Sequence, residues 1–322
     1  MSQNLRQPII GVLGHVDHGK TKVLDKIRGS ATQIGESGGI TQAIGASIIP
    51  LHVVQKICGS LLNNQKFTIP GLLFIDTPGH AAFTTLRKRG GSIADIAILV
   101  IDINEGFKPQ TLESIEILKS AKTPFVIAAN KIDLVPGYKQ KEKLIIKNIN
   151  SQDPFTNEQI ETKLYEIVGK LSELGIESER FDRIEDYTKQ IAICPVSAIN
   201  GDGISELLMV IMGLAQKYLE QSLNLHVEGN AKGTVLEVKE TTGLGKTMDV
   251  IIYDGVLKRN DNIIIGGIDK HIETRVKALL EPLPLKEMRD KKTKFKGVKE
   301  IIAATGVKIS APDIDNVIAG MP

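Results

Sequence analysis

The residues that point most directly to chemistry form a glycine-rich loop near the N-terminus. Residues 14–21 read GHVDHGKT and fit the phosphate-binding pattern G-x-x-x-x-G-K-[ST]. Glycines let backbone N–H groups crowd around phosphates, Lys20 can reach the terminal phosphates, and the Thr21 hydroxyl can bind Mg²⁺. A chance match is the alternative, but the apolar run before the loop and the helix-like segment after it supply the context that this pattern needs. The predicted phosphate-binding residues are Val16, Asp17, His18, Gly19, Lys20 and Thr21.

A second motif can bind a metal ion and respond to the terminal phosphate. The apolar run 72–75 ends in Asp76-Thr77-Pro78-Gly79. A carboxylate at the end of such a strand can hold Mg²⁺ through water, so we predict this role for Asp76. The Gly79 N–H can meet a γ-phosphate, and loss of that phosphate would then release the loop.

Two later motifs indicate which base the nucleotide carries. The run 125–129 reads as a buried strand and leads into the tetrapeptide NKID at 130–133, and the run 191–196 leads into Ser197. The Asp133 carboxylate can accept hydrogen bonds from the ring N–H and amino group of guanine, whereas adenine offers the wrong edge. Each motif alone is weak, but four in this order, each after a β-like run, predict a guanine-nucleotide switch. The predicted base-binding residues are Asn130, Lys131, Asp133, Ser197, Ala198 and Ile199.

The sequence around these motifs resembles one protein family in particular. GHVDHGKT and DTPGH are similar to the translational GTPases. The stretches GGITQAIGAS, DTPGHAAFTTLRKRG and DINEGFKPQT look like the family of translation initiation factor 5B, the archaeal and eukaryotic counterpart of bacterial initiation factor two. The resemblance runs from Pro8 to about Ala319 and is weakest between residues 138 and 189.

This resemblance implies roles that the motifs alone do not assign. Thr41 is the expected switch threonine that closes on Mg²⁺ and the γ-phosphate, and His80 is expected to orient the attacking water. Val16 and Ile40 match the apolar gate residues. The last motif reads S-A-I instead of S-A-K, so the lysine that often covers the base is missing. The resemblance gives Lys20, Thr41 and His80 as catalytic residues, and Thr21, Thr41 and, through water, Asp76 as Mg²⁺ ligands.

An acidic residue inside the phosphate loop suggests a second ion. Asp17 lies next to the predicted phosphates, which would normally repel it. A monovalent cation, Na⁺ or K⁺, that bridges Asp17, a phosphate oxygen and a carbonyl near Gly39 would turn this repulsion into attraction. In the alternative, Asp17 accepts hydrogen bonds from backbone N–H groups or lysine side chains and shapes the loop without an ion.

The pattern of elements predicts two domains. From Pro8 to about Glu220, short apolar strands alternate with amphipathic segments, which is typical of a P-loop α/β domain with a mostly parallel sheet and helices on both faces. We expect this GTP-binding domain at residues 1–220. Residues 138–186 are polar with helical spacing, so we expect a helical insertion there, either a partner-binding surface or a solvated elaboration.

Residues 221–322 have a different pattern. Short strands rich in β-branched residues follow one another at 233–238, 248–253, 262–265, 271–278 and 300–303, with turn signals between them. This spacing predicts a small antiparallel β-barrel as the second domain.

Composition limits the possible partners and compartments. The chain has 322 residues and a net charge of +2, so no global field draws it to nucleic acid. The N-terminus has no apolar targeting core and no apolar run is long enough to span a membrane, so we expect a cytoplasmic monomer. Cys58 and Cys194 read as buried apolar residues, and the remaining histidines, including His15 and His18, read as surface or loop groups. The basic segments 87–89 and 289–299 are each either a solvated surface or a contact with ribosomal RNA.

The resemblance also implies a function. We expect a ribosome-stimulated GTPase that uses Mg²⁺, contacts the ribosomal subunits and promotes their joining. Initiator tRNA is expected to bind only through domains that the family carries beyond this chain. One alternative is a GTP-gated tRNA carrier like the elongation factors, and another is a GTP-dependent ribosome-binding module with negligible intrinsic hydrolysis.

Overall fold

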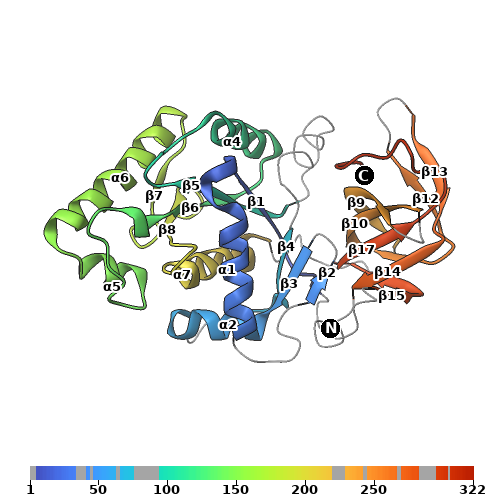
Figure 1. The fold of residues 1–322 in the computed structure, drawn as a ribbon, viewed down its shortest axis with the longest axis horizontal. Helices are drawn as coiled ribbons and strands as arrows, with labels where there is room; N and C mark the ends of the chain where they lie inside the picture. The colour runs from blue at the N-terminus through green and yellow to red at the C-terminus, as the bar shows by residue number, and fades with distance from the viewer. Residues whose placement is uncertain are drawn as a thin grey trace.

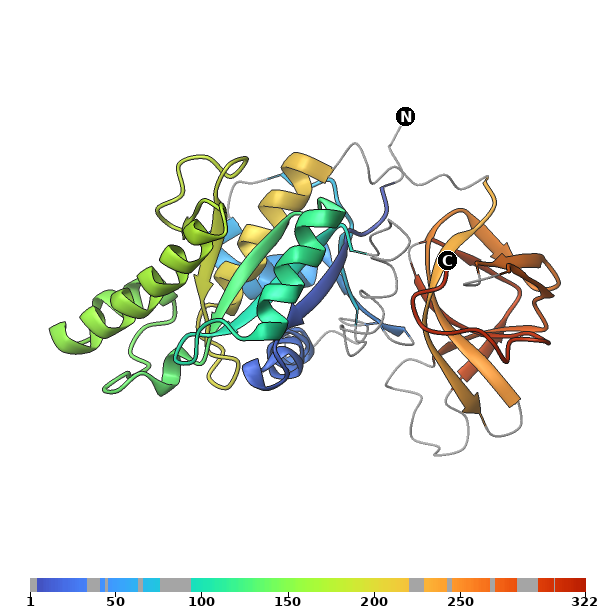
Figure 2. The same ribbon diagram turned by 90° about the horizontal axis from the view of Figure 1, so that it is seen from above.

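The protein contains a large sheet covered by helices and, beside it, a smaller set of antiparallel strands (Figures 1 and 2). The computed structural model describes residues 5–33, 41–43, 46–62, 66–75, 94–219, 229–241, 245–266, 270–282, 295–303 and 305–322. The predicted fold class, a mostly parallel α/β domain followed by an antiparallel β domain, is confirmed.

The larger domain is built on an eight-stranded sheet of order β2-β3-β4-β1-β5-β6-β8-β7. Its strands are β1 (Ile9–Gly14), β2 (Thr41–Ala43), β3 (Ala46–Pro50), β4 (Gly71–Ile75), β5 (Ile96–Asp102), β6 (Phe125–Asn130), β7 (Ser178–Arg180) and β8 (Ile191–Pro195). The strands from β4 through β7 in this order pair in parallel, whereas β3 pairs antiparallel with both β2 and β4. Every residue of β5 is buried, as expected for a central parallel strand with helices on both faces.

Helices cover both faces of this sheet. Three of them, α1 (Lys20–Gln33), α2 (Leu51–Cys58) and α7 (Ile204–Leu214), contact one another on one face. On the other face α4 (Pro109–Ala121) packs against β1 and β5 (Figure 2). Short helical turns follow at η2 (Gly59–Leu62) and, in π form, η4 (Ala215–Leu219).

The insertion is more than the predicted helical segment. It contains α5 (Ile145–Asn150) and α6 (Pro154–Glu173), and it also supplies β7, which extends the sheet beyond β8. The sequence analysis missed β7 because three residues are too few to show a strand period. One side of α6 is buried in the main core through Ile160, Leu164, Ile167 and Leu171. The insertion is therefore packed into the domain and shares its core.

The second domain, here called the barrel, consists of the antiparallel strands β9 to β17. A five-stranded sheet has the order β15-β14-β17-β10-β9, and β11 pairs with β16 and β12 with β13. The strands are β9 (Lys232–Thr241), β10 (Gly245–Asp254), β11 (Val256–Lys258), β12 (Asn262–Ile265), β13 (Ile272–Arg275), β14 (Ala278–Pro282), β15 (Phe295–Val298), β16 (Glu300–Ile302) and β17 (Thr305–Ser310). The sequence analysis did not predict β11, β15 and β17, and its strand at 271–278 covers β13 and only the first residue of β14.

The two domains share a small apolar cluster. Ile9 and Leu73 of the large sheet pack there with Leu236 and Ile251 of the barrel. Ile75, the last residue of β4, belongs to the same cluster, and β2 lies against β14 and β17 (Figure 1). The barrel therefore contacts the strand that contains Thr41 and the strand that leads into Asp76.

Both cysteines are buried and free, as the sequence analysis predicted. Burial raises the pKa of both thiols, with a further contribution from the nearby Glu206 carboxylate. Within the described part of the chain, no helix has the length and apolar character that crossing a membrane requires.

Candidate nucleotide-binding site

Three of the four motifs meet at one cavity of about 380 Å³. It lies at the carboxyl ends of β1, β6 and β8, the edge where ligands bind in open α/β sheets. The lining residues are Val16, Asp17, Gly19, Lys20, Thr21, Lys22, Asn130, Lys131, Asp133, Leu134, Ala198 and Ile199. Lys22 and Leu134 were not assigned from the sequence, and His18 and Ser197 do not line the cavity.

The phosphate loop is shaped by two glycines that tolerate no side chain. β1 ends at Gly14, a 3₁₀ turn η1 (Val16–His18) follows, and α1 begins directly after Gly19. Gly14 has φ +133°, and a Cβ there would lie 2.3 Å from the Val100 carbonyl oxygen. Gly19 has φ +90°, and a Cβ there would lie 2.5 Å from Nδ2 of Asn130. A side chain at Gly14 would thus meet the backbone of β5, and one at Gly19 would meet the Asn130 side chain.

Lys20 points back over the phosphate loop. Its Nζ donates hydrogen bonds to the carbonyl oxygens of Gly14 at 2.9 Å and His15 at 2.6 Å. Burial lowers the pKa of Lys20, and the nearby Asp17 charge opposes this effect. A phosphate oxygen at the loop could take the place of these acceptors. Thr21 is exposed and lines the cavity, so its hydroxyl suits a hard ion such as Mg²⁺.

His18 corrects an expectation from the sequence. Its side chain is fully buried, with Nδ1 3.4 Å from the Val100 carbonyl oxygen, so it is neither a surface group nor a lining side chain. Burial lowers its pKa, which favours a neutral ring. Its Nε2 and the Nδ1 of His15 are buried without a hydrogen-bond partner among the described residues. Only the backbone of His18 can therefore contribute to the loop surface.

Asn130 connects the three motifs at the cavity. Its Nδ2 donates to the carbonyl oxygen of His18 at 2.9 Å. Its Oδ1 accepts from the Ala198 N–H at 3.0 Å. The sequence analysis placed Asn130 at the base but did not foresee this connection. Ala198 was predicted to bind the base, and its N–H donates to Asn130 in this structure.

Lys131 is oriented by a buried carboxylate at the end of β5. Its Nζ lies 2.6 Å from Oδ2 of Asp102, and the Asn104 N–H donates to Oδ1 of Asp102 at 2.8 Å. Burial opposes ionisation of Asp102, but hydrogen bonds from Lys131 and Asn104 outweigh it, so the pKa of Asp102 is lowered. The sequence analysis missed Asp102, because its place opposite Asn130 depends on the parallel pairing of β5 with β6, which only the structure shows.

Exposed apolar side chains also line the cavity, and one of them, Leu134, directly follows Asp133 in the chain. Asp133 lies in the 3₁₀ turn η3 (Ile132–Leu134). Leu134, Ile199 and Val16 line the cavity with 60%, 61% and 65% of their surfaces exposed. Large exposed apolar side chains around a concave site indicate a surface that a ligand covers. A flat heterocyclic base suits this arrangement.

Two further side chains hold the loops at the cavity. Lys26 of α1 donates through Nζ to the carbonyl oxygen of Ile199 at 2.9 Å. The Val16 N–H donates to Oε1 of Gln110, the second residue of α4, at 3.1 Å. The Ser197 side chain is buried and accepts from the Asn200 N–H at 3.0 Å. The Ser197 side chain therefore stabilises its own loop and does not face the cavity.

Several predicted residues lie outside the described part of the chain. These are Gly39, Ile40, Asp76, Gly79, His80, the basic residues 87–89 and most of the basic segment 289–299. For Thr41 only the backbone is described, as the first residue of β2 opposite Ile48. Asp17 is exposed, and its side chain accepts no hydrogen bond from the described residues.

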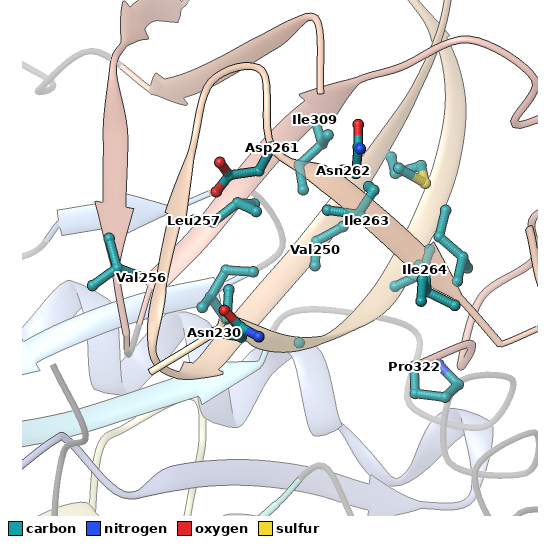
Figure 3. Close-up of a pocket in the computed structure, with 16 residues that line it drawn as sticks. Asn230, Val250, Val256, Leu257, Asp261, Asn262, Ile263, Ile264, Ile309 and Pro322 are labelled. Atoms are coloured by element: carbon teal, nitrogen blue, oxygen red, sulfur yellow. The ribbon is translucent and has the colours of Figure 1, made fainter. Parts of the chain in front are cut away.

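A larger cavity of about 480 Å³ lies in the barrel (Figure 3). Val250, Ile263 and Ile309 contribute to its apolar lining, and Asn230 and Pro322 lie near its edge. Asp261, its one acidic lining residue, already accepts from the Lys258 N–H at 2.8 Å. No predicted motif reaches this cavity, so the smaller one is the better candidate for chemistry.

Comparison with known proteins gives the family. Residues 5–217 match the elongation factor Tu GTP-binding domain. The chain is 56% identical to a Thermococcus sibiricus protein named probable translation initiation factor IF-2, over 99% of this chain and 54% of that protein. A protein of the same name from Methanococcus maripaludis is 59% identical over the same shares. The chain thus spans about half the length of these relatives.

Solved structures show the same relationship. The crystal structure of GDP-bound aIF5B from Aeropyrum pernix has a TM-score of 0.92 and 55% identity, covering 99% of this chain and 54% of that one. The elongation factor SelB of Methanococcus maripaludis, solved with a GTP analogue, has a TM-score of 0.54 at 19% identity. The second likeness is one of fold alone.

Proposed function

Because this chain belongs to the elongation factor Tu GTP-binding domain family, and its relatives are initiation factors IF-2 and aIF5B, we propose that it is the GTP-hydrolysing switch of a translation initiation factor. In this proposal the ribosome stimulates hydrolysis, and the GTP-bound form promotes joining of the ribosomal subunits. We assign residues 1–220, with the insertion at 138–186, to the GTP-binding domain and residues 221–322 to the barrel.

The observation that carries the proposal is the connection made by Asn130. By binding both His18 and Ala198, it holds the phosphate loop and the base loops around one cavity. Lys20 lines one part of that cavity and Asp133 another. A guanine nucleotide can therefore place its phosphates at Lys20 and its Watson–Crick edge at Asp133.

Phosphoryl transfer asks a protein mainly for positioning and for neutralisation of charge. In the proposed mechanism Lys20 neutralises the terminal phosphates, and His80 orients the attacking water. Thr21, Thr41 and, through water, Asp76 would hold Mg²⁺, which supplies positive charge at the β- and γ-phosphates. The exposed Thr21 hydroxyl at the cavity supports this assignment.

We further propose Asp17 as the ligand of a monovalent cation, Na⁺ or K⁺. Asp17 lines the cavity and its carboxylate accepts no hydrogen bond from the residues that the structure describes, which supports this role over shaping of the loop through hydrogen bonds. Hydrolysis should then be faster in Na⁺ or K⁺ than in a bulky organic cation at equal ionic strength, and Asp17→Ala should lose the difference. A native chain indifferent to the cation would contradict the assignment.

Partners and compartment follow from the family and are part of the proposal. The chain would act as a cytoplasmic monomer that contacts the ribosomal subunits, with ribosomal RNA contacts sensitive to salt. Initiator tRNA would bind only through the additional length of the relatives. The elongation-factor alternative, a GTP-gated tRNA carrier, is less well supported, because the SelB structure shares the fold at only 19% identity.

Hydrolysis with and without ribosomes tests this function. The native chain should hydrolyse GTP faster when ribosomal subunits are added, and His80→Ala should lower that stimulated rate by at least ~10²-fold, the low end for loss of a positioned catalytic group. GTP binding by the variant should stay nearly native. A stimulated rate that does not change in the variant would remove His80 from the mechanism, and no stimulation in the native chain would favour the non-hydrolysing module.

A further inference from the structure

The insertion contacts the base-recognition loop through one buried carboxylate, that of Asp202. Only 3% of Asp202 is exposed. The Tyr138 hydroxyl donates to its Oδ2 at 2.8 Å, and the Gln140 side-chain amide donates to its Oδ1. Tyr138 and Gln140 are the first residues of the insertion. A buried carboxylate needs such donors, because leaving it without them costs more free energy than a typical hydrogen bond contributes.

Asp202 also closes the loop that carries Ala198 and Ile199. Its carbonyl oxygen accepts from the Ser197 N–H at 2.9 Å, and the Gly201 N–H donates to the Ser197 carbonyl at 2.8 Å. Residues 197–202 therefore form a closed turn whose two ends are joined at Asp202. A shift of the Asp202 side chain would move this turn, and with it the cavity wall at Ala198 and Ile199.

Tyr138 is held in place on the insertion side. Its oxygen accepts from Nδ2 of Asn148, a fully buried residue of α5, at 2.7 Å. Its N–H donates to the carbonyl of Val135, two residues after Asp133. Burial, together with the hydrogen bond to Asp202, raises the pKa of Tyr138, so the phenol keeps its proton and can donate it. Tyr138 thus lies between the loop of Asp133 and the turn of Asp202.

A second contact joins the insertion to the segment that follows Asp133. The Thr156 hydroxyl, in the first turn of α6, donates to Oδ2 of Asp153 at 2.7 Å and lies 3.1 Å from the Pro136 carbonyl oxygen. Gly137 has φ +83°, and a Cβ there would lie 2.2 Å from the Thr156 oxygen. The helices of the insertion therefore pack directly against the end of the Asp133 loop.

We propose that Tyr138 and Asp202 are positioning residues through which the insertion holds the two base-recognition loops together and sets how long a guanine nucleotide stays bound. This inference rests on the proposed nucleotide-binding function. Neither residue lines the cavity, so both act through the loops. Lys26 and Asn130 still hold the 197–202 turn when the insertion contact is lost, so the expected defect is faster release with the fold intact.

The test is release of a fluorescent GDP from the whole chain, compared between two tyrosine variants. Tyr138→Phe removes the donor to Asp202. Tyr187→Phe is the matched control, because Tyr187 is also half-buried and its hydroxyl donates to the Phe181 carbonyl at 2.9 Å, away from the cavity. Tyr138→Phe should release GDP about tenfold faster, as expected for loss of a hydrogen bond to a charged group, whereas Tyr187→Phe should match the native rate.

Two variants of Asp202 distinguish loss of a specific hydrogen bond from a general loss of local stability. Asp202→Asn keeps one oxygen acceptor for Tyr138 but loses the charge and turns its amide N–H₂ toward the Gln140 donor, so it should release GDP faster than native. Asp202→Ala removes both acceptors and should release GDP faster still, at least as fast as Tyr138→Phe. Gln140→Ala, at an exposed position, removes the insertion's second donor to Asp202 and leaves the weaker one from Asn200 Nδ2 at 3.5 Å, so it should give a smaller acceleration even if Tyr138→Phe does not fold.

The outcomes distinguish this inference from the function on which it rests. Failure of the native chain to bind fluorescent GDP would overturn the proposed function itself. Native binding with equal release rates in Tyr138→Phe and Tyr187→Phe, whether both native or both faster, would overturn the positioning role. Release by Asp202→Asn as fast as by Asp202→Ala would also overturn it.

Discussion

The side chain of Asn130 donates to the backbone carbonyl of His18 at 2.9 Å, so the base-recognition motif is bonded directly to the phosphate loop. The same side chain accepts from Ala198. Because of these two bonds, a displacement of the phosphate loop should also shift Asn130 and the loop that contains Ala198.

Replacement of Asn130 by alanine should weaken GTP and GDP equally. Both bonds are lost, and each contributes ~1 kcal/mol net, so affinity should fall by roughly tenfold or more. Calorimetric titration of the two nucleotides measures this. Native affinity for both would show that the bonds are incidental to binding.

Two glycines in the first part of the chain should respond in opposite ways to alanine. Gly19→Ala forces a side chain into a left-handed conformation against Asn130, and such strain costs ~1–3 kcal/mol, so nucleotide affinity should drop about 10- to 100-fold. Gly29→Ala is the control, because a Cβ there meets no atom within 4 Å. It should leave affinity unchanged and stabilise α1 by ~0.5–1 kcal/mol. Similar affinities of the two variants would contradict the close packing of the loop.

His18 should make the fold sensitive to mild acid. Its pKa is lowered by burial in the folded protein, whereas an unfolded histidine titrates near ~6.5. The unfolded chain therefore binds more protons as the pH falls, and stability should be lost from about pH 6.5 downward. Urea unfolding at neutral and acidic pH should show a larger loss for the native chain than for His18→Gln. Equal losses would mean that His18 titrates normally when folded.

The barrel contains a buried ion pair between neighbouring strands. Nζ of Lys308 lies 2.5 Å from Oδ1 of Asp249, and the two residues are opposite each other on β17 and β10. Removing one partner, as in Lys308→Met, should cost up to ~3–5 kcal/mol, because the buried Asp249 carboxylate then keeps only the more distant Lys239, whose Nζ lies 3.8 Å from Oδ2. The double variant Asp249→Val/Lys308→Met should recover most of that loss in chemical unfolding. Additive losses would show that the charges do not interact.

The nucleotide motifs could be predicted because phosphate and guanine chemistry restricts residue types at fixed spacing. Three other residues of the site could not be predicted, because their roles depend on which side chains the fold brings together. These are Asp102, Lys26 and Gln110. Lys26, for example, reaches a carbonyl in a loop that is 173 residues away along the chain.

The fold was predictable where strands are continuous apolar runs, as in β5. The strands that were not predictable are either very short or contain a buried charged residue. β7 has only three residues. β17 contains the buried Lys308, whose charge hides the strand pattern until its partner Asp249 is seen. Pairing across distant strands is not visible in a local pattern.

The most direct test of the account is base selectivity of the purified chain. Competition for a bound fluorescent GDP should require far higher concentrations of ATP or ADP than of GTP or GDP, because Asp133 accepts only from the guanine edge. Asp133→Asn, which exchanges an acceptor for a donor, should weaken guanine nucleotides and favour xanthine nucleotides. Equal competition by ATP and GTP in the native chain would contradict the assignment of this cavity to guanine nucleotides.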